Sequence, residues 1–334
     1  MPNWSPKSKL GALPNVTDAL SLLPTKADAP SKYLVLGDVH ANWHALVAVL
    51  KHAQPKGCDA TLFLGDMVGY GPRPKECVEF LREGLAKSGP WVAGNHDYAV
   101  AGTPHYALRD YRQSGDAKTS TERHRDILSE SSRDDLGWFK TQVVEERARV
   151  QKRPFPRGAL AFVHGEPREE VGMFIYPDEP TNQGDALCEV RSVEKVGHET
   201  PLWLISGHTH CVCVAELAWG HQRTRLRALR YGEPQELSAP SMSYWINPGS
   251  VGQPRDGDPR AAYAVLDTEA ATITHYRVPY DTLSVQRELQ TFGYLHESSA
   301  LAETISTGHR ARVTHEHFES VYARLPGDAG VTPK

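Results

Sequence analysis

Five short apolar runs, each ending in glycine beside Asp, Asn or His, constrain the fold of this chain more than any other feature. They read "YLVLGDVH" from residue 33, "ATLFLGDMVGYG" from 60, "PWVAGNHD" from 90, "ALAFVHGEP" from 159 and "LWLISGHTH" from 202. Such runs, bounded by turn residues, are typical of buried strands, so each polar group falls at the carboxyl end of a strand. Helical patterns at 43–53 and 74–88 separate the first three strands and predict β-α-β alternation in a largely parallel first sheet.

The second half of the chain has a different pattern. Alternating residues with short turns occupy 211–219, 243–250, 261–269 and 271–279, which indicates antiparallel strands in a second sheet. The predicted fold class is therefore α/β, a two-sheet αββα sandwich of mixed parallel and antiparallel strands with the helices outside.

Length and composition predict the domain organisation. The chain has 334 residues, 40% of them hydrophobic, which is enough for a full core. We expect a flexible N-terminal arm at 1–30, where no periodicity is sustained, and a single domain at 31–325 with a helical excursion at about 100–155.

Charge, the length of the apolar runs and cysteine content argue against several classes of protein. A net charge of −4 argues against an extended nucleic-acid surface. The apolar runs are too short to cross a membrane, the N-terminus lacks a signal-peptide pattern, and the five cysteines form no CxxC pair. We therefore expect a cytoplasmic protein without a membrane partner, and the sequence leaves its oligomeric state open.

The strand ends together supply many oxygen and imidazole donors. Because the carboxyl ends of strands in an α/β sheet converge on one crevice, we expect these side chains to meet. They are too many for one ion, but they fit two divalent ions about 3.5–4 Å apart that share a bridging carboxylate. The mixed donor types suit Mn, Fe, Zn or Co better than Ca. The donors are Asp38, His40, Asp66, Asn95, His164, His208 and His210.

The same blocks carry a resemblance to a known family. GDVH, GDMVGYG, GNHD, HGEP and GHTH occur intact and in order, and over residues 33–278 the chain resembles the calcineurin-like metallophosphoesterase superfamily. The stretch "NPGSVGQPRDGDPRAAYAVLD" at 247–267 is similar to its prokaryotic small-phosphoesterase branch. The resemblance implies the two-sheet sandwich of that superfamily. It also implies that one metal is held by Asp38, His40 and His210, the other by Asn95, His164 and His208, and that Asp66 bridges them.

Three further residues are candidates for the site. By the same resemblance, His96 would protonate the leaving oxygen and Asp97 would orient His96. An Asp at this place can instead cap the segment that follows it. Arg255 lies in a Gly/Pro-rich turn and could contact a substrate phosphate, although a lone loop arginine is more often a surface residue.

The excursion between GNHD and HGEP begins and ends beside predicted metal ligands. A segment anchored in this way has few places to lie except along the mouth of the site. We therefore expect it to govern which phosphoesters enter, with candidate contacts at Tyr106, Arg109 and His124.

The predicted function is a binuclear-metal-dependent phosphoesterase, a hydrolase that cleaves phosphate mono- or diesters by attack of a metal-bridging hydroxide. A small-molecule or nucleotide-type phosphoester is the favoured substrate. A Ser/Thr-type phosphoprotein phosphatase is an alternative, weakened because "GDMVGYG" and "AGNHD" lack the phosphate-gripping arginines of the GDxVDRG and RGNHE blocks. A non-catalytic scaffold of the same fold is another, disfavoured because a scaffold does not need so many desolvated ligands. A zinc β-lactamase-like hydrolase would require an HxHxDH run, which is absent.

Overall fold

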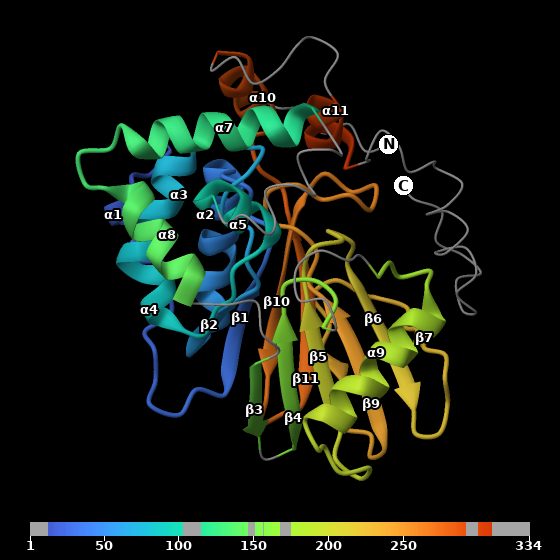
Figure 1. The fold of residues 1–334 in the computed structure, drawn as a ribbon. Coiled ribbons are helices and arrows are strands. Elements are labelled where there is room, and N and C mark those ends of the chain that lie inside the picture. The colour runs from blue at the N-terminus through green and yellow to red at the C-terminus, as the bar shows by residue number, and fades with distance from the viewer. Residues whose placement is uncertain are drawn as a thin grey trace.

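Two mixed β-sheets stack face to face, with helices on both outer sides (Figure 1). The structure, a computed structural model, describes residues 13–102, 115–145, 151–155, 157–167, 175–291 and 300–308. In spatial order, one sheet contains β2 (Ala60–Phe63), β1 (Lys32–Leu36), β10 (Ala261–Asp267), β11 (Thr272–Val278) and β8 (Gln235–Glu236). The other contains β3 (Gln151–Phe155), β4 (Gly158–Val163), β5 (Leu202–Ser206), β9 (Met242–Asn247), β6 (Cys213–Ala218) and β7 (Arg225–Leu226). The predicted fold class is confirmed.

The allocation of strands to the two sheets differs from the prediction. Strands β1 and β2 are parallel, but β1 also pairs antiparallel with β10, and β11 follows β10 in the same sheet. Strands β4, β5 and β9 form the parallel centre of the other sheet. The expected parallel first sheet and antiparallel second sheet are therefore wrong, because pairing crosses between the two halves of the chain.

The third apolar run also differs from its prediction. Instead of a strand, it forms a single parallel bridge between Phe63 and Trp91. The run has no room to extend, because helix α5 (Asn95–Ala101) begins directly after Gly94.

Side-chain alternation along the strands creates separate cores between the layers. Tyr33 and Val35 of β1 point between the sheets, together with Trp203 and Ile205 of β5. The intervening residue Leu34 packs on the opposite face, against the helices. The period of two in a strand thus lets each buried strand contribute to two cores.

Most of the helices lie on the outer face of the sheet that contains β1, and α9 lies on the other sheet (Figure 1). The helices on the β1 side are α1 (Val16–Leu20), α2 (Trp43–Ala53), η1 (Gln54–Lys56), α3 (Pro74–Phe80), η2 (Leu81–Leu85), α4 (Ala86–Ser88), α5, α7 (Gly115–Ser129), α8 (Asp135–Glu145), α10 (Thr282–Thr291) and α11 (Ala300–Thr307). Helix α9 spans Pro180–Val193.

A short stretch of the predicted N-terminal arm packs on the rest of the protein, whereas residues 25–29 are exposed. Helix α1 buries Val16 and Ala19, and the indole of Trp43 donates to the carbonyl of Pro14 at 3.0 Å. A five-residue helix is too short to produce a periodic sequence signal, which explains the difference. Residues 1–12 lie outside the described part, and the division into one domain stays a prediction.

The predicted helical excursion contains α7 and α8, and α7 runs across the helical layer in Figure 1. Both helices pack against α5, with Leu128 and Phe139 buried in the shared core. Residues 103–114 and 146–150, with the candidates Tyr106 and Arg109, lie outside the described residues.

Candidate metal centre

The predicted ligands meet at the carboxyl ends of the strands. Asp38 and His40 follow β1, Asp66 follows β2, His164 follows β4, and His208 and His210 follow β5, while Asn95 begins α5. All of these side chains are buried. The strand ends therefore converge as the topology predicts.

Several of these residues have a backbone conformation that non-glycine residues rarely adopt. The φ angles are +53° at Asp38, +50° at His40, +55° at Asp66, +66° at His208 and +61° at His210. Left-handed conformations cost about 1–3 kcal/mol each and persist only where the surroundings hold them. Their concentration at one place indicates a functional site. The left-handed backbone also directs side chains that are close in sequence into the same crevice.

Two groups of donors can be distinguished. The first donor group comprises Asp38, His40, Asp66 and His210, whose ligand atoms all lie within 4.8 Å of one another. The second donor group comprises Asp66, His164 and His208 by the same criterion, with the Asn95 Oδ1 atom 3.0 Å from His164 Nε2. Asp66 belongs to both groups.

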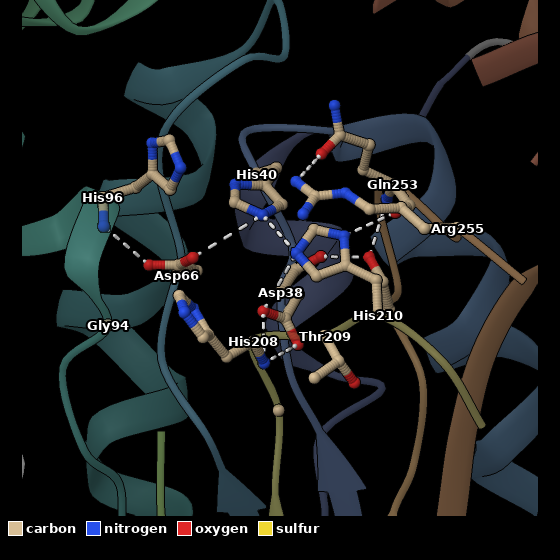
Figure 2. Close-up of polar contacts among 12 residues, drawn as sticks. Asp38, His40, Asp66, Gly94, His96, His208, Thr209, His210, Gln253 and Arg255 are labelled. Atoms are coloured by element: carbon tan, nitrogen blue, oxygen red, sulfur yellow. Dashed lines mark hydrogen bonds and ion pairs between the residues drawn. The ribbon is translucent and has the colours of Figure 1, made fainter. Parts of the chain in front are cut away.

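Backbone carbonyls set the tautomers of the first donor group. The Nδ1 atom of His40 lies 3.1 Å from the Val68 carbonyl, and Nδ1 of His210 lies 2.6 Å from the Gln253 carbonyl. A carbonyl only accepts, so Nδ1 carries the proton in both rings and the lone pair of each neutral imidazole is on Nε2. These two Nε2 atoms lie 3.1 Å apart (Figure 2). Two lone pairs at this distance call for a cation between them.

The second donor group repeats the arrangement. The Nδ1 atom of His164 lies 2.7 Å from the Leu64 carbonyl, which places the proton there and directs Nε2 into the crevice. That Nε2 faces the Asn95 Oδ1 atom and, at 3.1 Å, the Nδ1 atom of His208. Ligand-type nitrogen and oxygen atoms from three different elements thus meet at one place, as in the first donor group.

The shared carboxylate lies between the two groups. Asp66 Oδ1 accepts from the backbone N–H of His96 at 2.9 Å. Its Oδ2 atom lies 3.6 Å from His40 Nε2 and 3.4 Å from His164 Nε2, and among the described residues no group donates a hydrogen bond to it. A buried carboxylate oxygen without a donor is costly. Its position and chemistry fit a bridging metal ligand.

The pKa values of the site reflect burial and the close packing of charges. Burial lowers the pKa of His40 and of His208, which keeps both rings neutral and suited to binding a metal. Burial raises the pKa of Asp38 to about 6. Burial opposes a charge on His164 too, but the carboxylates of Asp66 and Asp38 outweigh it and raise the pKa of His164 to about 9. Without a cation, a proton thus neutralises part of the negative charge, and a metal would displace it.

Two residues of the NPGS turn hold the loops after β1 and β5 in place. The sequence alone indicated no role for either residue. The Asn247 side-chain amide donates to the Gly207 carbonyl at 2.7 Å, and Ser250 Oγ donates to the Asp38 carbonyl at 2.8 Å. The turn thus ties the loop after β5 to the loop after β1. The motif itself was the available signal, but only the fold reveals which loops it joins.

Glycines permit the closest approaches between these loops. A Cβ built on Gly94 would lie 2.1 Å from Asp66 Oδ1, and one on Gly207 would lie 2.6 Å from Asp38 Oδ2. Any other residue would push a carboxylate away from the crevice.

His96 and Asp97 both lie at the start of α5, beside the donor groups. The ring of His96 packs edge-on against His40 with centroids 5.0 Å apart. The Asp97 carboxylate accepts from the backbone N–H groups of Asp66, Val68 and Gly94. Asp97 thus both caps α5 and holds the loop of Asp66, and its predicted role in orienting His96 stays a prediction.

Arg255 lies at the upper edge of the site in Figure 2. Its Nη2 donates to Gln253 Oε1 at 2.6 Å, and its guanidinium carbon lies 5.9 Å from the centre of the Tyr70 ring. The structure thus brings the loop arginine to the first donor group. Tyr70, not singled out in the sequence, also packs on His96 with ring centroids 4.5 Å apart.

His124, predicted to contact substrate, has a different environment. Its side chain is fully buried in α7, where it bonds to backbone atoms of Gly69 and Gly71. The prediction of a substrate contact at His124 is wrong, because the amphipathic pattern of α7 turns this residue inward.

Comparisons with known proteins agree with this geometry. The model of the calcineurin-like phosphoesterase family matches residues 31–212. An uncharacterized protein of Methanocaldococcus jannaschii is 31% identical over 257 residues, which are 75% of this chain and 88% of that protein. The crystal structure of a metallophosphoesterase from Sphaerobacter thermophilus is 30% identical, with a TM-score of 0.61 over 84% of this chain and 100% of that chain.

A shorter match is to the symmetrical bis(5'-nucleosyl)-tetraphosphatase of Psychromonas ingrahamii, 41% identical over 64 residues, 19% of this chain and 23% of that protein. Among the helices that the structure describes, none is both long and apolar enough to cross a bilayer. The family model and the relatives of similar length confirm the resemblance seen in the strand-end motifs. This chain belongs to the calcineurin-like phosphoesterase family.

Proposed function

We propose that this protein is a divalent-metal-dependent hydrolase of phosphate mono- or diesters, acting on small-molecule or nucleotide-type substrates. The observation that carries the proposal is the pair of donor groups joined by Asp66. Backbone carbonyls fix the Nδ1 protons of His40, His210 and His164 away from the crevice. An arrangement that costs backbone strain and leaves a buried carboxylate oxygen without a donor fits metal binding better than a structural role.

The metal ligands in this proposal are the predicted ones. Asp38, His40 and His210 would hold one ion, Asn95, His164 and His208 would hold the other, and both would share Asp66. Mn, Fe, Zn or Co suit this donor set. When bound, such ions would neutralise charge growing on the phosphate oxygens and lower the pKa of the water that attacks phosphorus.

The leaving group requires a proton, and we assign the donation of this proton to His96. The Nδ1 side of this ring packs on Gly69, since a Cβ built there would lie 2.7 Å from Nδ1. The Nε2 atom is therefore the nitrogen from which the proton passes to the leaving oxygen. The ring lies beside the first donor group, with its centroid 5.0 Å from that of His40.

Arg255 is the proposed contact for a non-bridging phosphate oxygen. Its guanidinium is largely buried and lies at the edge of the first donor group, where an anion would gain a charge-assisted hydrogen bond. The phosphoprotein phosphatase alternative is weaker, because Tyr70 and Ala93 stand where that pattern has arginines. The short match to a dinucleoside tetraphosphatase adds dinucleoside polyphosphates to the candidate substrates.

The proposal is tested with metal-stripped protein reloaded with each divalent ion. The substrates are a nitrophenyl monoester, a bis-nitrophenyl diester, a cyclic nucleotide, a dinucleoside tetraphosphate and a phosphopeptide, and elemental analysis counts the ions. We expect two ions per chain and metal-dependent hydrolysis of the small esters. A strong preference for the phosphopeptide would overturn the substrate class. No hydrolysis with any ion, together with trace metal only, would favour the scaffold alternative.

A further inference from the structure

The proposed acid His96 rests on a short loop, Val68–Gly71, that follows the Asp66 block. Gly69 packs against the ring so closely that no Cβ would fit, and the Tyr70 ring lies 4.5 Å from it, centroid to centroid. The loop has a left-handed backbone: φ is +92° at Gly69, which glycine adopts freely, and +60° at Tyr70, where the side chain makes it costly. A loop in this conformation needs partners that hold it.

The partner comes from a distant part of the chain. The Gly69 N–H donates to Nδ1 of His124 at 3.0 Å, and Nε2 of the same ring donates to the Gly71 carbonyl at 2.8 Å. The imidazole therefore spans the loop with one acceptor and one donor, and its tautomer is fixed. Both the ring and the loop are buried, so water cannot replace these bonds without cost.

Helix α7 is itself anchored to the helix that carries His96. Arg125, next to His124, donates to the carbonyls of Ala99 and Val100 in the last turn of α5. Adjacent residues of α7 thus bind the α5 helix and the loop on which the His96 ring rests. An apolar residue at 124 could fill the space of the ring but would leave the Gly69 N–H without its acceptor.

We propose that His124 is a positioning residue for the leaving-group acid, acting through the Gly69–Gly71 backbone to hold the ring of His96. In this role the α7–α8 excursion supports the proton transfer rather than contacting the substrate. The proposal rests on the proposed function, because it assigns His124 to a step of that reaction.

The test compares three changes at one position. His124→Leu removes both hydrogen bonds, His124→Asn keeps an acceptor near Nδ1, and His124→Gln keeps a donor near Nε2. For an alkyl phosphoester, whose leaving oxygen needs a proton, we expect His124→Leu to lower kcat by roughly 30-fold, with smaller losses for the other two. For a nitrophenyl ester we expect less than about a threefold change, and KM and metal content should stay near wild type.

The matched control is Leu128→Ala, which removes a buried side chain of the same helix and leaves both hydrogen bonds of His124 to the loop in place. It should lower thermal stability without changing the ratio of alkyl to nitrophenyl rates. In a His96→Asn background, His124→Leu should add no further loss on the alkyl ester, because the group it positions is gone. Equal losses on both esters, or full additivity with His96→Asn, would overturn the proposal.

A second measurement does not depend on activity. Ring ¹H–¹³C relaxation of His96, measured by NMR in the full chain, should reveal greater mobility in His124→Leu than in wild type or Leu128→Ala. An unchanged His96 ring would contradict the positioning role even if the hydrolase proposal holds. Absence of phosphoester hydrolysis in wild type would instead refute the proposed function, and the NMR result would still decide whether His124 holds the ring.

Discussion

The strand-end loops and helix α7 both bury histidines completely, yet the two environments are opposite. At the strand ends, the Nε2 atoms of His40 and His210 face each other at 3.1 Å. In α7, both ring nitrogens of His124 bond to complementary backbone groups. Burial and residue type do not separate a ligand from a structural histidine. The two kinds of histidine are separated by the partner of the second ring nitrogen, because a metal ligand needs a lone pair that accepts no hydrogen bond from within the protein.

The largest expected effect is at the shared carboxylate. Asp66→Asn keeps an acceptor for the His96 N–H but removes the bridging negative charge. We expect kcat/KM to fall by at least about a thousandfold, equal to about 4 kcal/mol in the barrier. The metal-free variant should be less stable to unfolding than metal-free wild type, because the buried imidazole of His164 loses the carboxylate that raises its pKa. The control is Asp185→Asn, which changes an exposed carboxylate on α9. Equal activity of the two variants would refute the role of Asp66 as a metal ligand.

The next largest effect is on the pH dependence of the unfolding free energy, and it distinguishes His124 of α7 from the histidines at the strand ends. Burial lowers the pKa of His124 from 6.5 to about 4. Between these two pH values His124 binds a proton in the unfolded chain but not in the folded protein. The contribution of this ring to the unfolding free energy is therefore complete above pH 6.5 and is lost as pH falls toward 4. It amounts to about 3 kcal/mol. Chemical denaturation of wild type and His124→Gln at several pH values measures it. Curves that stay parallel from pH 7 to 4 would contradict the buried neutral ring.

Metal addition should stabilise the protein only through the strand ends. At a free ion concentration about 100 times the dissociation constant, we expect metal-stripped wild type to gain about 2.7 kcal/mol in unfolding free energy for each ion bound. His124→Gln should gain the same amount, and Asp66→Asn much less. Differential scanning calorimetry with and without the ion measures the gain. A full gain in Asp66→Asn would place the metal away from this centre.

The strand-end motifs could be predicted from the sequence because each ligand follows its strand directly, and parallel strands bring their carboxyl ends together. The assignment of strands to sheets could not be predicted from the sequence, since the antiparallel pairing of Val35 with Ala264 depends on contacts between the two ends of the chain. Nor could the role of His124, which lies in a helix of mixed polarity far along the chain from Gly69. Asn247 was visible as part of a motif, but its partner Gly207 appears only in the fold.

The smallest expected effect is on the outward face of α7, and it tests whether the excursion also governs substrate entry. Lys118 and Glu122 form an exposed pair at 4.0 Å, one turn apart, and such pairs contribute only about 0.3–0.5 kcal/mol. If this face lay along the mouth of the site, Lys118→Glu would repel an anionic phosphoester and raise its KM. Because exposed charges are screened beyond about 8–10 Å at physiological salt, we expect less than about a twofold change for a nitrophenyl ester and for a dinucleoside tetraphosphate alike. Steady-state kinetics at low and physiological salt measure both. A KM raised more than about fivefold for the dinucleotide alone, and relieved by salt, would place α7 at the entrance and restore the predicted gating role of the excursion beside the internal role of His124.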